Sequence, residues 1–97
     1  MVEEIIWTER ATQDYLSASI TLVPDQDIDN FLGLAKVFPE IGSSVRWSSN
    51  IHRGLIGPKR VYGIFYSVHG SRLFVLALLD LRMDSKSIEA IVDTRLP

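Results

Sequence analysis

Two runs of helical periodicity fill most of the first forty residues, after one short β-prone segment. Ile5, Ile6 and Trp7 form that segment, and the residue after them, Thr8, is of a type that commonly caps a helix. Apolar side chains then recur at steps of three and four over residues 9–22 and again from residue 25 to about residue 38. Pro24 separates the runs, because proline fits a first helical turn and not a helix interior. The pattern predicts two amphipathic helices that form an antiparallel pair.

The second half of the chain alternates with the two-residue period of β-strands. Residues 43–50 are polar and are expected to form a loop, and strands are expected over residues 51–56, 60–68 and 72–80. A tight turn around Gly70 joins the last two strands. Residues 73–79 are all apolar, which is typical of an interior strand. Its two expected faces are Leu73, Val75, Ala77 and Leu79 on one side and Phe74, Leu76 and Leu78 on the other.

One α+β domain spanning residues 1–97 accounts for all of these elements. In the strand 60–68, the alternate residues Tyr62, Ile64, Tyr66 and Val68 are expected on one face. After residue 83, Asp84 or Ser85 is expected to cap a last short helix. The predicted order is β-α-α-β-β-β-α, with the N-terminal helical hairpin packed on a mostly antiparallel sheet.

Composition excludes several kinds of site. The 97 residues include no cysteine and only two histidines, which excludes disulfides, cysteine nucleophiles and thiolate metal sites, and no metal site is expected. The sequence holds no phosphate loop, so no cofactor is expected either. Acidic residues directly follow Val2 where a signal peptide would be apolar, and the apolar run 73–79 is shorter than the roughly 20 residues of a membrane helix. We therefore expect a cytoplasmic protein without membrane contact.

Charge is distributed unevenly although the net charge is only −2. Residues 1–40 carry eight acidic and two basic side chains, whereas residues 41–79 carry five basic and no acidic ones. A segment of one sign indicates an anionic partner for that part of the chain. The basic side chains of this segment belong to Arg46, Arg53, Lys59, Arg60 and Arg72.

Several short motifs follow one another in a characteristic order. Trp7-Thr8 ends the first strand, and Ala11 and Asp14-Tyr15-Leu16 lie in the first helix. The second helix ends on the motif Leu34-x-x-x-Phe38-Pro39-x-x-Gly42. It is followed by Arg53-x-Leu55, by Tyr62-x-Ile64-x-Tyr66-x-Val68, and by the run 73–79 with Asp80-Leu81-Arg82. In order and spacing, over nearly the whole chain, these motifs resemble the RelE/ParE superfamily of bacterial toxins.

The resemblance implies the toxin of a plasmid-stabilising type II toxin–antitoxin system, which inhibits growth and is neutralised by a cognate antitoxin. Toxins related to ParE act on DNA gyrase, whereas those related to RelE cut messenger RNA on the ribosome. We expect the gyrase-type mechanism, because no His or Tyr occurs from residue 70 onward and Asp80 lies near the position where many relatives have histidine. A carboxylate there would repel a phosphate. A non-toxic binding partner in an antitoxin complex is a third alternative.

Candidate site residues come from the basic segment and the end of the last strand. For the nuclease alternative, the resemblance implies Arg53, Arg60 and Arg82 as catalytic cations, without metal. His52 and Lys59 are candidates for proton transfer.

The candidate binding residues are Arg46, Trp47, His52, Lys59 and Arg72. An exposed Trp beside an Arg suits an antitoxin anchor or a platform for a nucleobase, and the alternative is that Trp47 packs back over the helix pair. Arg46, Arg53 and Arg60 are expected to contact antitoxin carboxylates. Homo- and hetero-oligomers both remain open.

Overall fold

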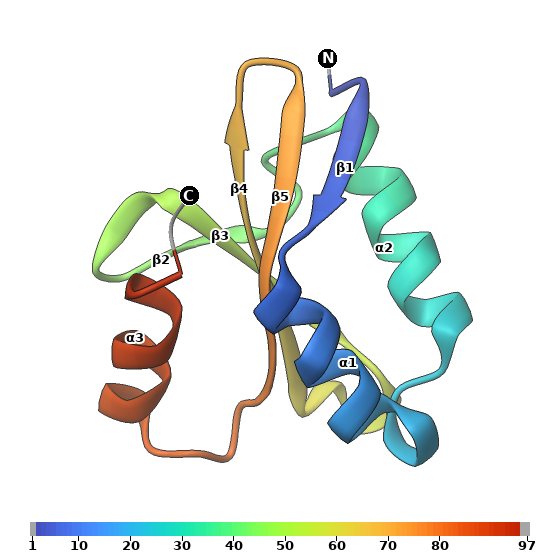
Figure 1. The fold of residues 1–97 in the computed structure, drawn as a ribbon, viewed down its shortest axis with the longest axis vertical. Coiled ribbons are helices and arrows are strands. Elements are labelled where there is room, and N and C mark those ends of the chain that lie inside the picture. The colour runs from blue at the N-terminus through green and yellow to red at the C-terminus, as the bar shows by residue number, and fades with distance from the viewer. Residues whose placement is uncertain (1, 96–97) are drawn as a thin grey trace.

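Five strands form one sheet in the order β1-β5-β4-β3-β2 (Figure 1). The computed structural model describes residues 2–95, and for residues 18–22 only their helical backbone. β1 pairs with β5 in parallel, and all other neighbours in the sheet are antiparallel. The elements are β1 (Glu4–Trp7), α1 (Glu9–Leu22), α2 (Asp25–Val37), β2 (Ser43–Val45), β3 (Ser48–Ile56), a 3₁₀ turn (Pro58–Arg60), β4 (Tyr62–His69), β5 (Arg72–Asp80) and α3 (Ser85–Asp93).

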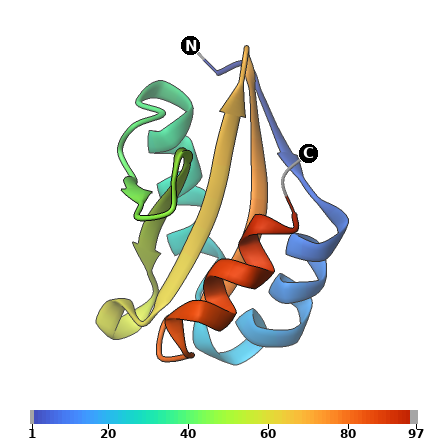
Figure 2. The same ribbon diagram turned by 90° about the vertical axis from the view of Figure 1, so that its left-hand side faces the viewer.

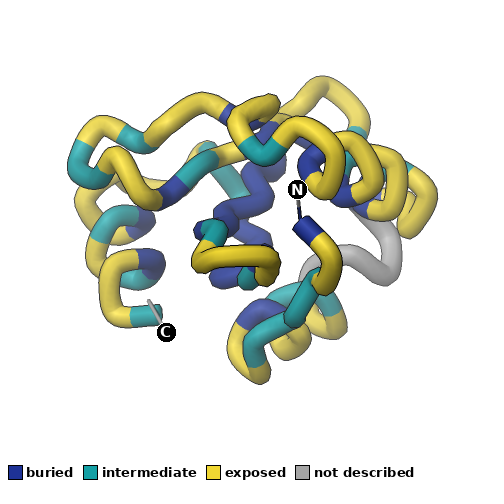
Figure 3. Tube along the Cα trace, turned by 90° about the horizontal axis from the view of Figure 1, so that it is seen from above, coloured by how far each residue is buried: buried dark blue, intermediate teal, exposed yellow. Residues whose placement is uncertain are grey.

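Helices cover both faces of the sheet. The helical hairpin α1–α2 packs on one face, where Ala11, Ile28 and Leu32 meet the strands in the larger buried cluster. Helix α3 packs on the other face and contributes Ile88 and Val92 to a second cluster. Figure 2 shows α3 in front of the sheet and α2 behind it, and in Figure 3 the buried positions lie between these layers. The predicted α+β class and order of elements are confirmed, and the structure adds one short strand, β2.

Side-chain caps fix the starts of α1 and α3. The hydroxyl of Thr8 accepts a hydrogen bond from Ala11 N at 3.2 Å and donates one to the carbonyl of Val75 at 2.9 Å. The carboxylate of Asp84 accepts from Ser87 N at 3.1 Å at the start of α3. Thr8 thereby ties the start of α1 to β5 as well as capping the helix. None of the helices in the described residues 2–95 has both the length and the apolar character to cross a membrane.

The prediction of a loop over residues 43–50 is wrong. Ser43–Val45 forms β2, and β3 begins at Ser48, so that Ser43 pairs with Arg53 and Ser44 with His52. These residues are polar because β2 is an edge strand with most of its side chains in solvent. The hydroxyl of Tyr66 holds the chain before β2, since it donates to the carbonyl of Pro39 at 2.7 Å and accepts from Gly42 N at 3.0 Å.

The prediction of which side chains of β5 share a face of the sheet is wrong after Leu76. Phe65 pairs with Ala77, but the next residue, Tyr66, pairs with Val75, so Leu76 is the extra residue of a β-bulge. The bulge reverses the alternation. Leu78 therefore joins Leu73 and Val75 under the hairpin α1–α2, while Ala77 and Leu79 join Leu76 under α3.

The strand expected from Arg60 begins two residues later, at Tyr62. Lys59 and Arg60 instead belong to the 3₁₀ turn, with φ of 61° and 52°, a left-handed region that side chains other than glycine rarely adopt. The expected common face of β4 is confirmed: Tyr62, Ile64, Tyr66 and Val68 all contribute to the cluster beneath α1 and α2.

Candidate functional site

Three of the predicted site residues lie together in a groove beside α3. Arg46, Trp47 and Arg53 line a hollow of about 290 Å³, which we call the basic groove. Its apolar wall comes from β2, β4, the segment after β5 and α3, through Val45, Phe65, Leu81, Met83 and Ile88. Ser85, at the first position of α3, adds a hydroxyl. The groove thus combines two cations with an apolar surface.

Strand register places Arg53 in the groove. Arg53 pairs with Phe65 of β4 and lies on the α3 side of the sheet, like Ile51 two residues earlier. A side chain at Gly63 would place its Cβ 3.3 Å from Cγ of Arg53 and 2.8 Å from Cδ2 of Leu81. Gly63 therefore leaves room for the stem of Arg53, and the ion pairs of the described residues include neither Arg53 nor Arg46.

Trp47 is half-buried, which corrects the expectation of an exposed side chain. It packs against the cluster beneath α3, so it also does not fold over the helix pair α1–α2. Its indole Nε1 is buried without a hydrogen-bond partner among the described residues. A buried donor without an acceptor costs about 1–3 kcal/mol, so the packing of the ring outweighs that cost.

Arg82 is bound by its neighbour Asp80. Nε and Nη2 of Arg82 donate to the two carboxylate oxygens of Asp80 at 3.0 and 2.7 Å, and the backbone N–H of Arg82 donates to the same carboxylate at 2.9 Å. The side-chain hydrogen bonds from Arg82, followed by the backbone one, lower the pKa of Asp80 to about 2. The charge of Arg82 is therefore balanced within its own turn, and Arg82 does not line the basic groove.

The other predicted residues lie away from the groove. His52 is on the opposite face of the sheet, stacked on Tyr66 with ring centroids 5.4 Å apart and with Nδ1 3.2 Å from the carbonyl oxygen of Gly42. Lys59 and Arg60 belong to the 3₁₀ turn after β3. Arg72, at the start of β5, pairs with Glu4 at 3.3 Å. None of these four residues lines the groove, so they do not form one site with Arg53.

The basic groove presents two arginine cations but, among its described lining residues, no side chain suited to proton transfer. Among residues 2–95, those that line it include no His, Tyr, Asp, Glu or Lys. RNA cleavage by a 2′-hydroxyl needs a base for that proton and an acid for the leaving oxygen, and arginine is a poor candidate for either role. Tyr62 and Tyr66 are buried on the other face of the sheet. Nor does any group of three or more acidic or histidine side chains with metal-binding geometry occur in the described part of the chain.

Sequence reasoning missed an exposed apolar stripe at the end of α2. Leu34, Val37, Phe38 and Ile41 are 50%, 50%, 62% and 43% exposed. Val37, Phe38 and Ile41 follow Leu34 by three, four and seven residues, which is the spacing of one helix face, so the sequence pattern carried this signal. We call these four residues the α2 stripe.

Comparison of the sequence with models of known protein families finds no match, and comparison with curated proteins finds none either.

Proposed function

We propose that this protein is the toxin of a type II toxin–antitoxin pair, and that it acts in the cytoplasm by binding a protein target, of which DNA gyrase is the first candidate. Its antitoxin covers the α2 stripe. The proposal rests on the resemblance in the order of motifs and on the exposed surface of the molecule.

The α2 stripe carries the proposal, because it is an exposed apolar surface suited to contact with another protein. Four large apolar side chains within eight residues remain at least 43% exposed, although the same helix buries Ile28, Leu32 and Ala35. Contiguous exposed apolar surface of this kind is typical of protein–protein contacts. An amphipathic segment of an antitoxin supplies the matching apolar face.

The basic groove favours binding over catalysis. Arg46 and Arg53 offer two cations to an anionic partner, but the described lining supplies no side chain suited to general acid–base work. The same two cations are the observation that favours the competing function, a ribosome-dependent ribonuclease. In that case the arginines would hold the scissile phosphate.

Two assays with purified protein separate these functions. We expect inhibition of gyrase supercoiling and no cleavage of messenger RNA in a translation extract. The double variant R46A/R53A is the probe of the groove, and R72A, which removes an exposed arginine at the start of β5, is the matched control. Codon-dependent cleavage that R46A/R53A abolishes and R72A retains would overturn the proposal in favour of the nuclease. Soluble folded protein that leaves growth unchanged would leave only the non-toxic binding partner.

Antitoxin binding is tested on the α2 stripe. The antitoxin is sought as the product of a neighbouring small gene with a DNA-binding head and an amphipathic tail. Phe38→Ser should weaken complex formation with that product at least about tenfold, because truncating an apolar anchor at the centre of an interface costs about 2 kcal/mol or more. Leu16→Ser, at a side chain of similar exposure (57%) on α1, is the control. Equal effects of the two substitutions would remove the α2 stripe from the interface.

A further inference from the structure

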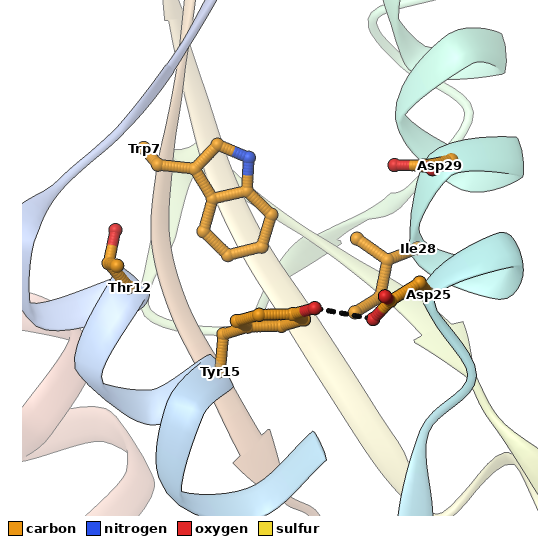
Figure 4. Close-up of a pocket in the computed structure, with 6 residues that line it drawn as sticks. All are labelled: Trp7, Thr12, Tyr15, Asp25, Ile28 and Asp29. Carbon is orange, nitrogen blue, oxygen red and sulfur yellow. Dashed lines mark hydrogen bonds between the residues drawn. The ribbon is translucent and has the colours of Figure 1, made fainter. Parts of the chain in front are cut away.

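A second cavity lies on the opposite side of the molecule from the basic groove, between β1, α1 and α2. It has a volume of about 300 Å³ and is lined by Trp7, Thr12, Tyr15, Asp25, Ile28 and Asp29 (Figure 4). We call it the Trp7 cavity. Trp7 comes from the end of β1, Tyr15 from α1, and Asp25, Ile28 and Asp29 from the first two turns of α2.

Two aromatic rings form a corner of this cavity. The rings of Trp7 and Tyr15 meet at an angle of 67° with their centroids 5.9 Å apart. Both side chains are half-buried and pack against the cluster beneath α1 and α2, while part of each ring lines the cavity. The phenol of Tyr15 donates to the carboxylate of Asp25 at 2.5 Å, as the dashed line in Figure 4 marks. The corner is therefore held between both helices and β1 before any ligand arrives.

Two carboxylates face the rings from α2. Asp25 and Asp29 are four residues apart, and Figure 4 shows both on the side of the cavity opposite Trp7. The ion pairs within residues 2–95 include neither of them. The pKa of Tyr15 is raised, first because it donates a hydrogen bond to Asp25, then by burial and by the negative charges of Asp25 and Asp29. The cavity is therefore electronegative.

We propose that the Trp7 cavity binds the guanidinium group of an arginine side chain presented by a partner polypeptide. Aromatic faces attract cations, most strongly when the ring is an indole. Guanidinium fits better than ammonium because it is planar, stacks on an aromatic face and donates in a fork to carboxylates. Ile28 lines the same cavity and provides apolar contact for the methylene stem of the arginine. Anionic groups are excluded by Asp25 and Asp29.

This inference does not depend on the proposed toxin function. The occupant follows from charge and shape alone: a flat cation attached to an apolar stem, entering a cavity of about 300 Å³ with aromatic and acidic walls. The residues substituted in the tests of the proposed function, Arg46, Arg53 and Phe38, do not line this cavity. Failure of one proposal therefore leaves the other standing.

Titration of the ¹⁵N-labelled protein with methylguanidinium tests the proposal. The chain has two tryptophans, so the indole N–H signal of Trp7 reports on the cavity and that of Trp47 serves as the internal control. We expect a saturable shift of the Trp7 signal with a dissociation constant of about 1–10 mM, because charge-assisted hydrogen bonds to the carboxylates add to the aromatic contact, and no saturable shift of Trp47. Urea has the same flat shape without charge and should shift neither signal. Methylammonium should bind more weakly than methylguanidinium.

Variants distinguish binding in the Trp7 cavity from nonspecific attraction to the negative charge of the surface. Asp29→Asn should weaken methylguanidinium binding about tenfold, because it removes a carboxylate that lines the cavity. Asp27→Asn removes the same charge from the same helix but does not line the cavity, and it should change binding less than twofold. Trp7→Phe keeps an aromatic side chain for packing and should weaken binding, since phenylalanine holds cations less well. Because this variant lacks the reporter indole, its titration is followed on the backbone amide signals of the residues that line the cavity. Unchanged backbone amide spectra show that each variant is folded.

Three results would overturn the assignment. Equal shifts of Trp7 and Trp47, or equal losses from Asp27→Asn and Asp29→Asn, would show that guanidinium only screens the acidic surface. Tighter binding of tetramethylammonium than of methylguanidinium would assign the cavity to alkylated amines instead of arginine. A short peptide with one arginine, compared with the same peptide carrying lysine, completes the test and should bind more tightly.

Discussion

Asp14 of α1 and Arg95, after α3, form an ion pair that closes the exposed edge of β5. Their closest atoms, Oδ2 and Nη1, are 2.5 Å apart, and the two side chains are only 17% and 12% exposed. Asp14 also accepts from Leu78 N at 3.1 Å, and Arg95 donates to the carbonyl of Leu76 at 3.1 Å. Strand β1 ends opposite Val75, so beyond that point the ion pair replaces a neighbouring strand for β5.

Breaking this pair should be costly. Asp14→Ala leaves the guanidinium of Arg95 largely buried without its counter-charge, and we expect a loss of about 2–4 kcal/mol in the free energy of unfolding, measured with urea. Arg72→Ala breaks the exposed pair with Glu4, in which both side chains are about 60% exposed, and should cost less than about 1 kcal/mol. Equal costs would show that burial gives the Asp14–Arg95 pair no special role.

Gly54 and Gly33 should respond to alanine with opposite signs. A Cβ at Gly54 would lie 2.2 Å from Cζ of Phe31, so Gly54→Ala displaces the ring of Phe31 from its packing between α2 and β3 and should destabilise the protein by about 1–3 kcal/mol. At Gly33, on the exposed side of α2, a Cβ meets nothing within 4 Å. Gly33→Ala should stabilise by about 0.5–1 kcal/mol, because alanine favours helix.

Thermal or urea unfolding of the two glycine variants checks that contrast. Phe31→Leu combined with Gly54→Ala should recover part of the loss, since a smaller side chain frees the space that the new Cβ needs. A Gly54→Ala variant as stable as the original protein would mean that the ring of Phe31 moves aside without cost.

Acid should weaken the Asp80–Arg82 ion pair below about pH 4. The folded protein lowers the pKa of Asp80 from 3.8 to about 2. The ion pair therefore makes its full contribution to the stability of the folded state at pH values above 3.8. That contribution is lost as the pH falls from about 4 towards 2. Arg82→Gln should return the pKa of Asp80 towards its ordinary value, measured by a titration of the side-chain carboxyl carbon in NMR spectra. Arg72→Gln, a matched loss of an exposed cation, should leave that titration unchanged.

Trp47→Phe should be nearly neutral for stability. The substitution removes an indole N–H that is buried without an acceptor among the described residues, and it retains most of the aromatic packing beneath α3. The two effects oppose each other, so we expect a change within about 1 kcal/mol in urea unfolding. Trp47→Ala removes the packing as well and should destabilise by about 2–4 kcal/mol. A large loss from the Phe variant would indicate that the indole N–H has an acceptor in solution.

Local patterns were enough to predict the three helices and four of the five strands, all except β2. The caps at Thr8 and Asp84, the break at Pro24 and the turn at Gly70 each depend on residues close in sequence. The bulge at Leu76 does not, because it appears only when β4 and β5 are paired. All residues from 73 to 79 are apolar, so the sequence pattern does not indicate that the side chains of β5 change faces after Leu76.

The basic segment was visible in the sequence, but its division among separate places was not. Arg46 and Arg53 are brought together by the pairing of β2 with β3, whereas His52, between them in sequence, points to the other face. Arg82 was placed correctly at the end of β5, yet its partner Asp80 balances its charge. The Trp7 cavity combines residues from three elements, and only the spacing of Asp25 and Asp29 hinted at it.

The parallel pairing of β1 with β5 also has a kinetic consequence. Thr8 and Val75 are 67 residues apart in sequence, and Asp14 and Arg95 are 81 residues apart. At a synthesis rate of about 5–20 residues per second, Val75 is made roughly 3–13 s after Thr8, and Arg95 roughly 4–16 s after Asp14. During translation the apolar face of the helical hairpin α1–α2 is therefore exposed until the strands that cover it have been synthesised. The contacts Thr8–Val75 and Asp14–Arg95 that complete this layer are among the most distant in sequence in the fold.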